Sequence, residues 1–200
     1  MEYFFYGRDT PGAGHLLEEL AEAHWSYMDA YAEAMIARGP TLTPDRQTHT
    51  GSMHIVDLPD GEAARAFVAD EPYYKAGVYG DVLIRRWRNE LGRRMWDFRR
   101  GASGYLRFLI VAHGGPGVSH AAAELLEEHR RYLAVGGYED RIIERGPLLS
   151  DDGTEWVGSA MLVELPDRAA VDALVSGEPY VSAGLCASVE IHDWEFGGRP

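Results

Sequence analysis

One eight-residue stretch occurs twice in the sequence, and this repeat constrains the fold more than any other feature. Residues 70–77 read DEPYYKAG and residues 177–184 read GEPYVSAG. An Arg-Gly-Pro, a Gly-Ser and a Leu-Pro precede each copy in the same order, and a tryptophan follows each copy. A repeat of this length marks a duplicated structural unit. The chain is therefore predicted to contain one domain of about a hundred residues twice.

The repeat also sets the expected domain boundaries. The first domain is expected at residues 1–88, a linker at 89–103 and the second domain at 104–200. The linker combines several arginines with Trp96 and Phe98, which would suit a nucleic-acid or anion-binding patch. A solvated connector is the favoured interpretation, because the chain as a whole carries a net charge of −13.

Composition excludes several classes of protein. A net charge of −13 argues against a nucleic-acid-binding protein, which needs a basic face. The single cysteine, Cys186, excludes an internal disulfide framework and a cysteine-based zinc site. The N-terminus lacks a signal-peptide pattern, and no apolar run has the length of a bilayer span. We therefore expect a cytoplasmic protein that makes no contact with membranes or nucleic acids.

Hydrophobic periodicity predicts the same order of strands and helices in both halves. In the first half, strands are expected at 2–7, 41–43, 52–58 and 81–87, and helices from His15 to Gly39 and from Pro59 to Pro72. In the second half, strands are expected at 104–112, 158–165 and 188–196, and helices at 119–145 and 167–176. Each half is assigned the β-α-β-β-α-β order of a ferredoxin-like unit.

The strands are apolar on both faces, which bears on how the two halves associate. A sheet covered by helices on one side only should have a polar outer face. Residues 106–111 and the strand around Ile55 do not show one. The predicted fold class is therefore α+β, with tandem ferredoxin-like repeats whose sheets face each other in an intramolecular pseudo-dimer of the dimeric α+β barrel type.

Two histidines and two glutamates recur at matching places in the repeat. His24 and His129 each lie on the apolar stripe of a long predicted helix, where a histidine is more often structural than catalytic. Glu71 and Glu178 each directly precede a proline at a helix end, a position also typical of a solvated terminus. A carboxylate beside an imidazole fixes its tautomer and supports its action as a general base.

The succession His, Arg-Gly-Pro, Gly-Ser, Glu-Pro-Tyr, Ala-Gly and Trp, present twice, resembles the YCII-related (YciI-like) family. The resemblance covers nearly all of both halves, and it implies a ferredoxin-like fold that dimerises through its sheets. It also implies an active site centred on a histidine and an acidic residue, which correspond here to His24 with Glu71 and to His129 with Glu178. The family usually has aspartate at the acidic position and often an arginine before the histidine. Dehydrohalogenase-type lyase chemistry on small ring compounds is attributed to the family.

Further residues around the two histidines complete the candidate sites. In the first site Asp70 is a second candidate carboxylate, and the expected substrate-binding residues are Tyr27, Tyr73, His54, His49 and Ser52. The second, weaker site comprises His129, Glu178, Tyr132 and Ser159. His24, His49 and His54 could together bind a metal, but their spacing matches no strong zinc signature, so no metal is expected.

The predicted function is that of a cofactor-independent acid–base enzyme, a lyase or isomerase acting on a small cyclic or aromatic metabolite. His24 would be the base and Glu71 its orienting partner, with the Tyr27 and Tyr73 hydroxyls facing the substrate. One alternative is a non-catalytic protein that binds or sequesters a small ligand. Another is a cofactor-free oxygenase or haem-binding protein of the dimeric α+β barrel type. A homodimer of the tandem chain is left open.

The two sites are expected to be unequal, with the N-terminal one active. The polar residues of the first site are replaced in the second by apolar residues or glycine. The replacements are Trp156 for His49, Met161 for His54, Gly177 for Asp70 and Val181 for Tyr74. Apolar side chains at these positions suit packing better than proton transfer.

Overall fold

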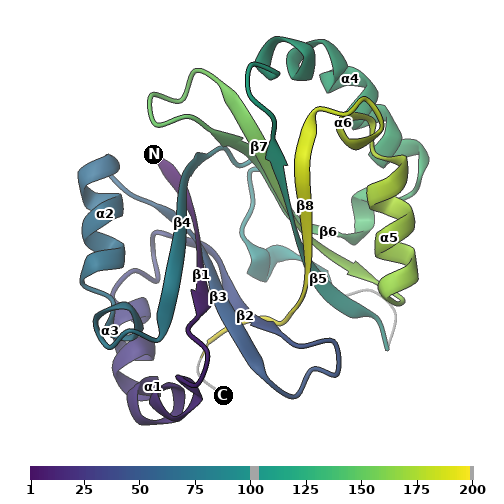
Figure 1. The fold of residues 1–200 in the computed structure, drawn as a ribbon. Helices are drawn as coiled ribbons and strands as arrows, with labels where there is room; N and C mark the ends of the chain where they lie inside the picture. Colours follow the sequence, from purple (N-terminus) through teal and green to yellow (C-terminus); the bar gives the residue numbers. More distant parts are fainter. Residues whose placement is uncertain (100–103, 199–200) are drawn as a thin grey trace. The chain divides into compact units, whose positions relative to one another are not determined.

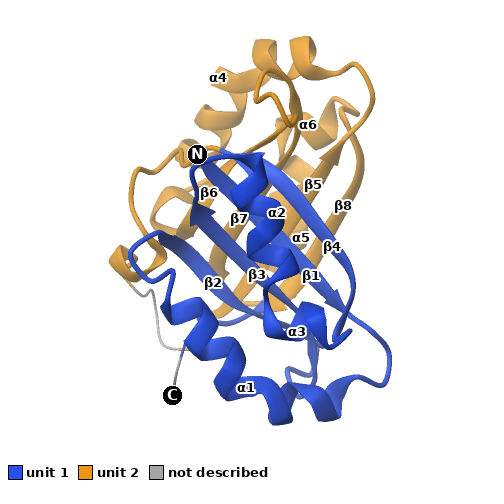
Figure 2. Ribbon diagram, turned by 90° about the vertical axis from the view of Figure 1, so that its left-hand side faces the viewer, with its two compact units in different colours: residues 1–87, 194–200 blue, residues 88–193 orange. Residues whose placement is uncertain are grey.

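The computed structural model describes residues 1–99 and 104–198, and the chain divides into two compact units. The first unit comprises Met1–Trp87 together with Trp194–Pro200, and the second comprises Arg88–Asp193 (Figure 2). The C-terminal segment thus belongs to the unit built by the N-terminal half. The stretch expected as a linker begins inside the second unit and contains a short helix, η1 (Met95–Asp97); residues 100–103 lie outside the described part.

Unit 1 is a four-stranded antiparallel sheet with its helices on one face (Figure 1). Its elements are β1 (Glu2–Asp9), α1 (Gly14–Asp29), β2 (Met35–Leu42), β3 (His49–Asp57), α2 (Gly61–Ala69), α3 (Pro72–Lys75) and β4 (Tyr79–Trp87). The strands lie in the order β4-β1-β3-β2. This is the predicted ferredoxin-like order.

Unit 2 repeats the arrangement with strands in the order β8-β5-β7-β6. Its elements are β5 (Leu106–Gly114), α4 (Ser119–Val135), η2 (Glu139–Arg141), β6 (Ile142–Leu149), β7 (Trp156–Leu165), α5 (Arg168–Gly177), α6 (Pro179–Ser182) and β8 (Cys186–Trp194). Among the described residues, the helices are too short or too polar to span a bilayer.

The predicted first helix of each unit was too long. α1 ends at Asp29, and Met35–Leu42 is strand β2, which pairs with β3 through Gly39 and Met53. Residues 30–37 are nearly all compatible with a helix, so pairing across the sheet decides their conformation. In unit 2, α4 ends at Val135 and Ile142–Leu149 forms β6. Here the sequence contained a signal for the helix end, the pair Gly136-Gly137. Gly137 has a φ of 71°, a left-handed conformation that favours glycine and often ends helices.

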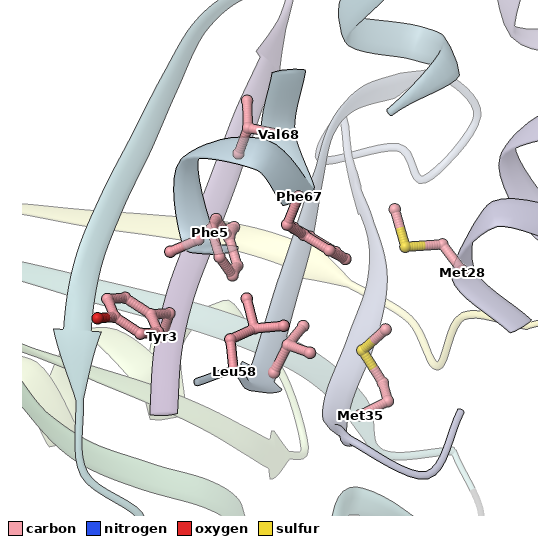
Figure 3. Close-up of a cluster of buried hydrophobic side chains, with 9 residues drawn as sticks. Tyr3, Phe5, Met28, Met35, Leu58, Phe67 and Val68 are labelled. Carbon is pink, nitrogen blue, oxygen red and sulfur yellow. The ribbon is translucent and has the colours of Figure 1, made fainter. Parts of the chain in front are cut away.

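The core of unit 1 lies between the sheet and its helices (Figure 3). Phe5 of β1 and Phe67 of α2 have ring centroids 4.7 Å apart, and Met28 of α1 is almost completely buried beside them. Val171 and Leu174 of α5 pack in the same way on β5 and β7 in unit 2. In unit 1 this layer fixes α1, the helix that carries His24, through Met28.

A β-bulge at the start of β3 determines which side chains face the helices. Thr41 pairs with Gly51 while Leu42 pairs with His49, so Thr50 is an extra residue in β3. The bulge places His49 on the same face as Ser52, which simple alternation would not do. β7 has the same bulge, since Leu148 pairs with Gly158 and Leu149 with Trp156.

The C-terminal segment packs directly on β2 because Gly39 has no side chain. The backbone N–H groups of Glu195 and Gly197 donate to the carbonyl oxygens of Pro40 and Arg38, at 3.2 Å and 2.9 Å. A Cβ atom at Gly39 would lie 1.9 Å from the carbonyl oxygen of Glu195. No side-chain rotation can relieve a contact with backbone, so the segment itself would have to move.

Gly39→Ala is therefore expected to lower the free energy of unfolding by about 1–3 kcal/mol, the usual cost of overpacking. Urea denaturation measures the change. Gly14→Ala is the matched control, because a Cβ atom at Gly14 meets nothing within 4 Å. Equal stability of the two variants would show that the C-terminal segment does not pack closely on β2.

Candidate functional site

His24 is held on the buried face of α1. His24 and Met28 are the buried residues of this helix, one turn apart, so they face the sheet together. His24 is only 8% exposed, and its Nδ1 atom lies 2.7 Å from Oε1 of Glu71. The expected histidine–carboxylate pair is present in the structure.

Glu71 is positioned by the start of the short helix α3. It is the N-cap of this helix, with Pro72 at the first helical position, and its Oε2 atom accepts a hydrogen bond of 2.8 Å from the Tyr74 N–H. The proline pre-sets the helical backbone, and a side-chain oxygen at the N-cap satisfies a free N–H group. Each carboxylate oxygen of Glu71 thus has one partner. With Nδ1 donating to Glu71, the His24 Nε2 atom carries the lone pair.

Tyr73 supports the His24 ring from the side. The two rings are stacked, with centroids 4.2 Å apart and planes 10° apart. The Tyr73 hydroxyl donates to the carbonyl oxygen of Leu17 at 2.9 Å, and burial, followed by the charge of Glu71, raises the pKa of Tyr73 to about 12. The Tyr73 hydroxyl therefore bonds to α1, where a contact to substrate was expected, while its ring faces His24.

A cavity of about 360 Å³ opens in front of His24. α1 supplies an apolar wall that includes Leu17, Ala21 and Trp25, and the sheet supplies a polar wall. The polar wall consists of Arg38, His49, Ser52 and His54. Nε2 of His24 has no hydrogen-bond partner among residues 1–99 and 104–198. The volume lies within the range of small-ligand sites.

His54 faces this cavity as a neutral imidazole. It is 6% exposed, and burial, followed by the nearby His24, lowers its pKa well below 6.5. Its ring nitrogens make no hydrogen bond to any residue that the structure describes. A neutral imidazole offers one donor and one acceptor. A polar ligand atom would satisfy this buried group.

His49 is held by a carboxylate in the same way as His24. Its Nδ1 atom lies 2.7 Å from Oδ2 of Asp9, at the end of β1, and its Nε2 atom lies 3.2 Å from the Ser52 hydroxyl. Sequence reasoning missed Asp9, because a lone aspartate at a strand end has no distinguishing pattern. Only strand pairing, which sets β1 beside β3, brings Asp9 to His49.

Unit 2 contains a second histidine–carboxylate pair. The Nδ1 atom of His129 lies 2.6 Å from Oε1 of Glu178, and the Val181 N–H donates to the other carboxylate oxygen at 3.1 Å. Tyr180 stacks on His129 with centroids 4.8 Å apart. The cavity beside His129 has a volume of about 200 Å³ and includes Ser159 in its lining.

Comparison with known proteins agrees with this duplicated arrangement. The family model of the YCII-related domain matches residues 1–88 and again residues 106–195. The chain belongs to the YCII-related family. An uncharacterized protein from Haemophilus influenzae is 27% identical over 95 residues, which cover 44% of this chain and 97% of that protein. The family resemblance of the sequence is thereby confirmed.

Solved structures share the fold of this YCII-related protein. A chlorite dismutase variant from Candidatus Nitrospira defluvii aligns over 97% of this chain and 91% of its own, with 9% identity and a TM-score of 0.62. Such neighbours are dimeric α+β barrel proteins, which confirms the predicted fold class. A 5-chloro-2-hydroxyhydroquinone dehydrochlorinase from Burkholderia phenoliruptrix is 26% identical, covering 46% of this chain and 99% of its own with a TM-score of 0.43.

Three residues expected in the sites of this YCII-related protein lie elsewhere. Asp70 is exposed and forms an ion pair of 3.0 Å with Lys75. The Tyr27 hydroxyl donates to the carbonyl oxygen of Phe67 at 3.0 Å. Tyr132 makes the corresponding bond to Leu174 in unit 2, also at 3.0 Å. Both tyrosines lie one turn or less from a site histidine, yet they point toward α2 and α5 and tie these helices to α1 and α4.

The two cavities differ because of a linked pair of replacements. In unit 2, Gly114 and Trp156 occupy the positions of Asp9 and His49, judged from strand pairing. A Cβ atom on Gly114 would lie 2.7 Å from the Trp156 ring, so the tryptophan fits only because residue 114 is a glycine. The bulky ring takes space that is open in unit 1 and accounts for part of the smaller volume.

An ion pair further restricts the second cavity. The Glu90 N–H donates to the Arg145 carbonyl oxygen as the Gly197 N–H donates to that of Arg38, so Glu90 and Gly197 are equivalent. The Glu90 carboxylate lies 3.4 Å from the Arg145 guanidinium and lines the cavity. At the first cavity the equivalent Gly197 has no side chain, which leaves that entrance wider.

The lowered pKa of His54 should make the free energy of unfolding depend on pH. Because burial lowers its pKa in the folded state, the unfolded chain binds a proton near pH 6.5 that the folded chain does not. Its contribution to stability is present above pH 6.5 and is lost as the pH falls below that value, by at most about 1.4 kcal/mol per pH unit.

His54→Met introduces the residue that unit 2 has at this position, Met161, and removes the titrating group. Between about pH 7.5 and pH 5.5, wild type is expected to lose about 1 kcal/mol more unfolding free energy than the variant. Urea denaturation at both pH values measures the difference. Equal losses would show that folding does not lower the pKa of His54.

Proposed function

We propose that unit 1 is a proton-transfer enzyme that acts on a small molecule, with His24 as the base and Glu71 as its orienting partner. The observation that carries the proposal is the 2.7 Å bond between Glu71 and Nδ1 of His24, made by a ring that lines a cavity of about 360 Å³. A general base needs a lone pair within reach of the substrate and a partner that stabilises the protonated ring. His24 and Glu71 supply both.

The reaction proposed is abstraction of an acidic C–H or O–H proton. The proton moves to Nε2 of His24, and the resulting imidazolium is stabilised by the carboxylate of Glu71 through Nδ1–H. The electron pair left on the substrate either expels a leaving group, as in a lyase, or takes the proton back at another atom, as in an isomerase. The proposed reaction uses no cofactor, because His24 provides the base and Glu71 stabilises its protonated form.

The walls of the cavity favour a flat, partly polar substrate. Leu17, Ala21 and Trp25 of α1 form an apolar surface that suits the face of a ring. The opposite wall, formed by Arg38, Ser52 and His54, suits hydroxyl or carbonyl oxygens at its edge. We therefore propose small cyclic or aromatic hydroxy or carbonyl compounds as the substrate class.

A screen in heavy water tests the proposal across this whole class of compounds. The protein is incubated in D₂O with cyclic ketones, phenols and hydroxyquinones, and NMR and mass spectrometry follow deuterium uptake and product formation. Catalytic deuteration or conversion of at least one compound, at more than one turnover per chain, is expected. Stoichiometric binding of compounds that never turn over would instead identify a protein that sequesters a ligand.

A further inference from the structure

The first cavity contains a second hydrogen-bonded row of side chains that the proposed proton transfer does not use. Asp9, His49 and Ser52 follow one another with 2.7 Å between Asp9 Oδ2 and His49 Nδ1 and 3.2 Å between His49 Nε2 and Ser52 Oγ. The His49 side chain is 21% exposed and that of Asp9 is 14% exposed, so the row lies beneath the cavity surface. His49 and Ser52 both line the cavity.

The geometry of β3 places His49, Ser52 and His54 on the same face of the sheet. Ser52 and His54 lie two residues apart on β3 and therefore face the same side. The bulge at Thr50 adds His49 to that side. Gly7 pairs with Ser52 across the sheet, and the Tyr79 ring packs on this glycine, 2.8 Å from where a Cβ atom of residue 7 would lie.

The order carboxylate, imidazole, hydroxyl is the one that activates serine nucleophiles on unrelated folds. We propose that Ser52 is a nucleophile activated by His49 and Asp9, so that the first cavity also catalyses the hydrolysis of small activated esters. The imidazole nitrogen that faces Asp9 donates to it, which leaves Nε2 to accept the hydrogen bond from Ser52.

The reaction balances with water as the second substrate. Ser52 Oγ bonds to the acyl carbon of the ester while its proton moves to His49 Nε2. The acyl–oxygen bond to the alcohol then breaks, and the alcohol leaves with that proton. Water repeats the sequence: its oxygen bonds to the acyl carbon, His49 takes its proton, the bond to Oγ breaks, and Ser52 regains the proton.

His54 offers a group that can stabilise the oxyanion formed in this reaction. Its neutral ring carries an N–H that has no partner among residues 1–99 and 104–198, and it lines the same cavity as Ser52. A side-chain N–H that is already positioned in a buried site can stabilise an oxyanion by donating a hydrogen bond to it. The buried, unpartnered imidazole thereby acquires a role.

Unit 2 retains the serine but not the groups that would activate it. Ser159 lines the second cavity at the position of Ser52, whereas Trp156 and Gly114 stand where His49 and Asp9 stand in unit 1. The base and its carboxylate were exchanged together. Ser159 is therefore an internal control: it is a serine at the same position that lacks the histidine and the aspartate needed to activate it.

Two serine-reactive probes test the proposal on the full chain. p-Nitrophenyl acetate should give a burst of p-nitrophenolate and an acetyl group on Ser52, and a fluorophosphonate should label the same residue stably. Intact-mass and peptide mass spectrometry locate the label. Ser52→Ala is expected to abolish labelling, and His49→Gln and Asp9→Asn to slow it by about a hundredfold or more, as loss of a triad member does.

Ser159→Ala is the control and should leave the rate and position of labelling unchanged. Labelling of neither serine, labelling of a histidine in place of Ser52, or unchanged rates in His49→Gln would each overturn the proposal. Because Ser52 is intact in the His49 and Asp9 variants, the test stands even where Ser52→Ala unfolds. His24 and Glu71 take no part in this step, so its failure leaves the proton-transfer proposal standing, and the reverse also holds.

Discussion

His24→Gln is expected to lower kcat/KM by about a hundredfold or more for any substrate that the heavy-water screen identifies. Glutamine has a similar size and can still hydrogen-bond to Glu71, but its amide cannot accept a proton from the substrate. The loss should appear mainly in kcat, because binding depends on the walls of the cavity. Steady-state kinetics with the identified substrate measures both parameters.

Glu71→Gln should produce a smaller loss, of about tenfold or more, because the protonated His24 ring then lacks its carboxylate. Both variants are assayed after thermal melting shows that they are folded. A kcat/KM within a few-fold of wild type for His24→Gln would mean that His24 is a structural residue of α1.

Phe67→Ala is expected to lower the free energy of unfolding by about 3–5 kcal/mol, the usual cost of removing a buried phenylalanine side chain. Phe67 is 2% exposed and lies beside Phe5 in the core (Figure 3). Its ring centroid is 4.7 Å from that of Phe5 and 4.9 Å from that of Tyr31. Alanine would leave a cavity between α2 and the sheet that these large, closely packed neighbours can fill only in part.

Phe67→Leu is the matched control, because Leu174 packs at the corresponding place in unit 2. It should cost less than about 1.5 kcal/mol, since most of the buried volume is kept. Urea denaturation of both variants gives the two values. A cost below about 1 kcal/mol for Phe67→Ala would mean that α2 repacks on the sheet.

The repeat in the sequence was enough to predict the fold of each unit, because matching motifs must occupy matching places in a duplicated domain. The ends of α1 and α4 were predicted less well. Residues 30–37 favour a helix locally, and only pairing between β2 and β3 shows that Met35–Leu42 is a strand. For α4, Gly137 indicated the helix end, and it does adopt the left-handed conformation. The apolar periodicity that continues beyond it led to the longer prediction.

The candidate site was predicted in part for a similar reason. Histidine–carboxylate pairs recur with the repeat, so His24 and Glu71 were found together with His129 and Glu178. Tyr27 was misplaced because helical spacing gives the face of a helix only approximately, and its hydroxyl reaches Phe67. Asp9 was missed because its partner, His49, is distant in the chain and meets it only through strand pairing and a bulge.

We propose that the cavity of unit 1, and not that of unit 2, performs the reaction. The cavity beside His24 is larger, about 360 Å³ against about 200 Å³, and it has polar groups where the other has Trp156 and Met161. Both histidines make the same bond to a glutamate, at 2.7 Å and 2.6 Å. Substituting glutamine for His24 and for His129 therefore removes the same histidine–glutamate pair from two different cavities. A difference between the two variants is then due to the cavity.

Kinetics of His24→Gln and His129→Gln, measured side by side on one substrate, distinguishes the two cavities. We expect a loss of about a hundredfold or more in kcat/KM for His24→Gln. His129→Gln should stay within a few-fold of wild type and lower only the melting temperature. Equal losses would mean that both cavities are active, and a larger loss for His129→Gln would place the reaction in unit 2.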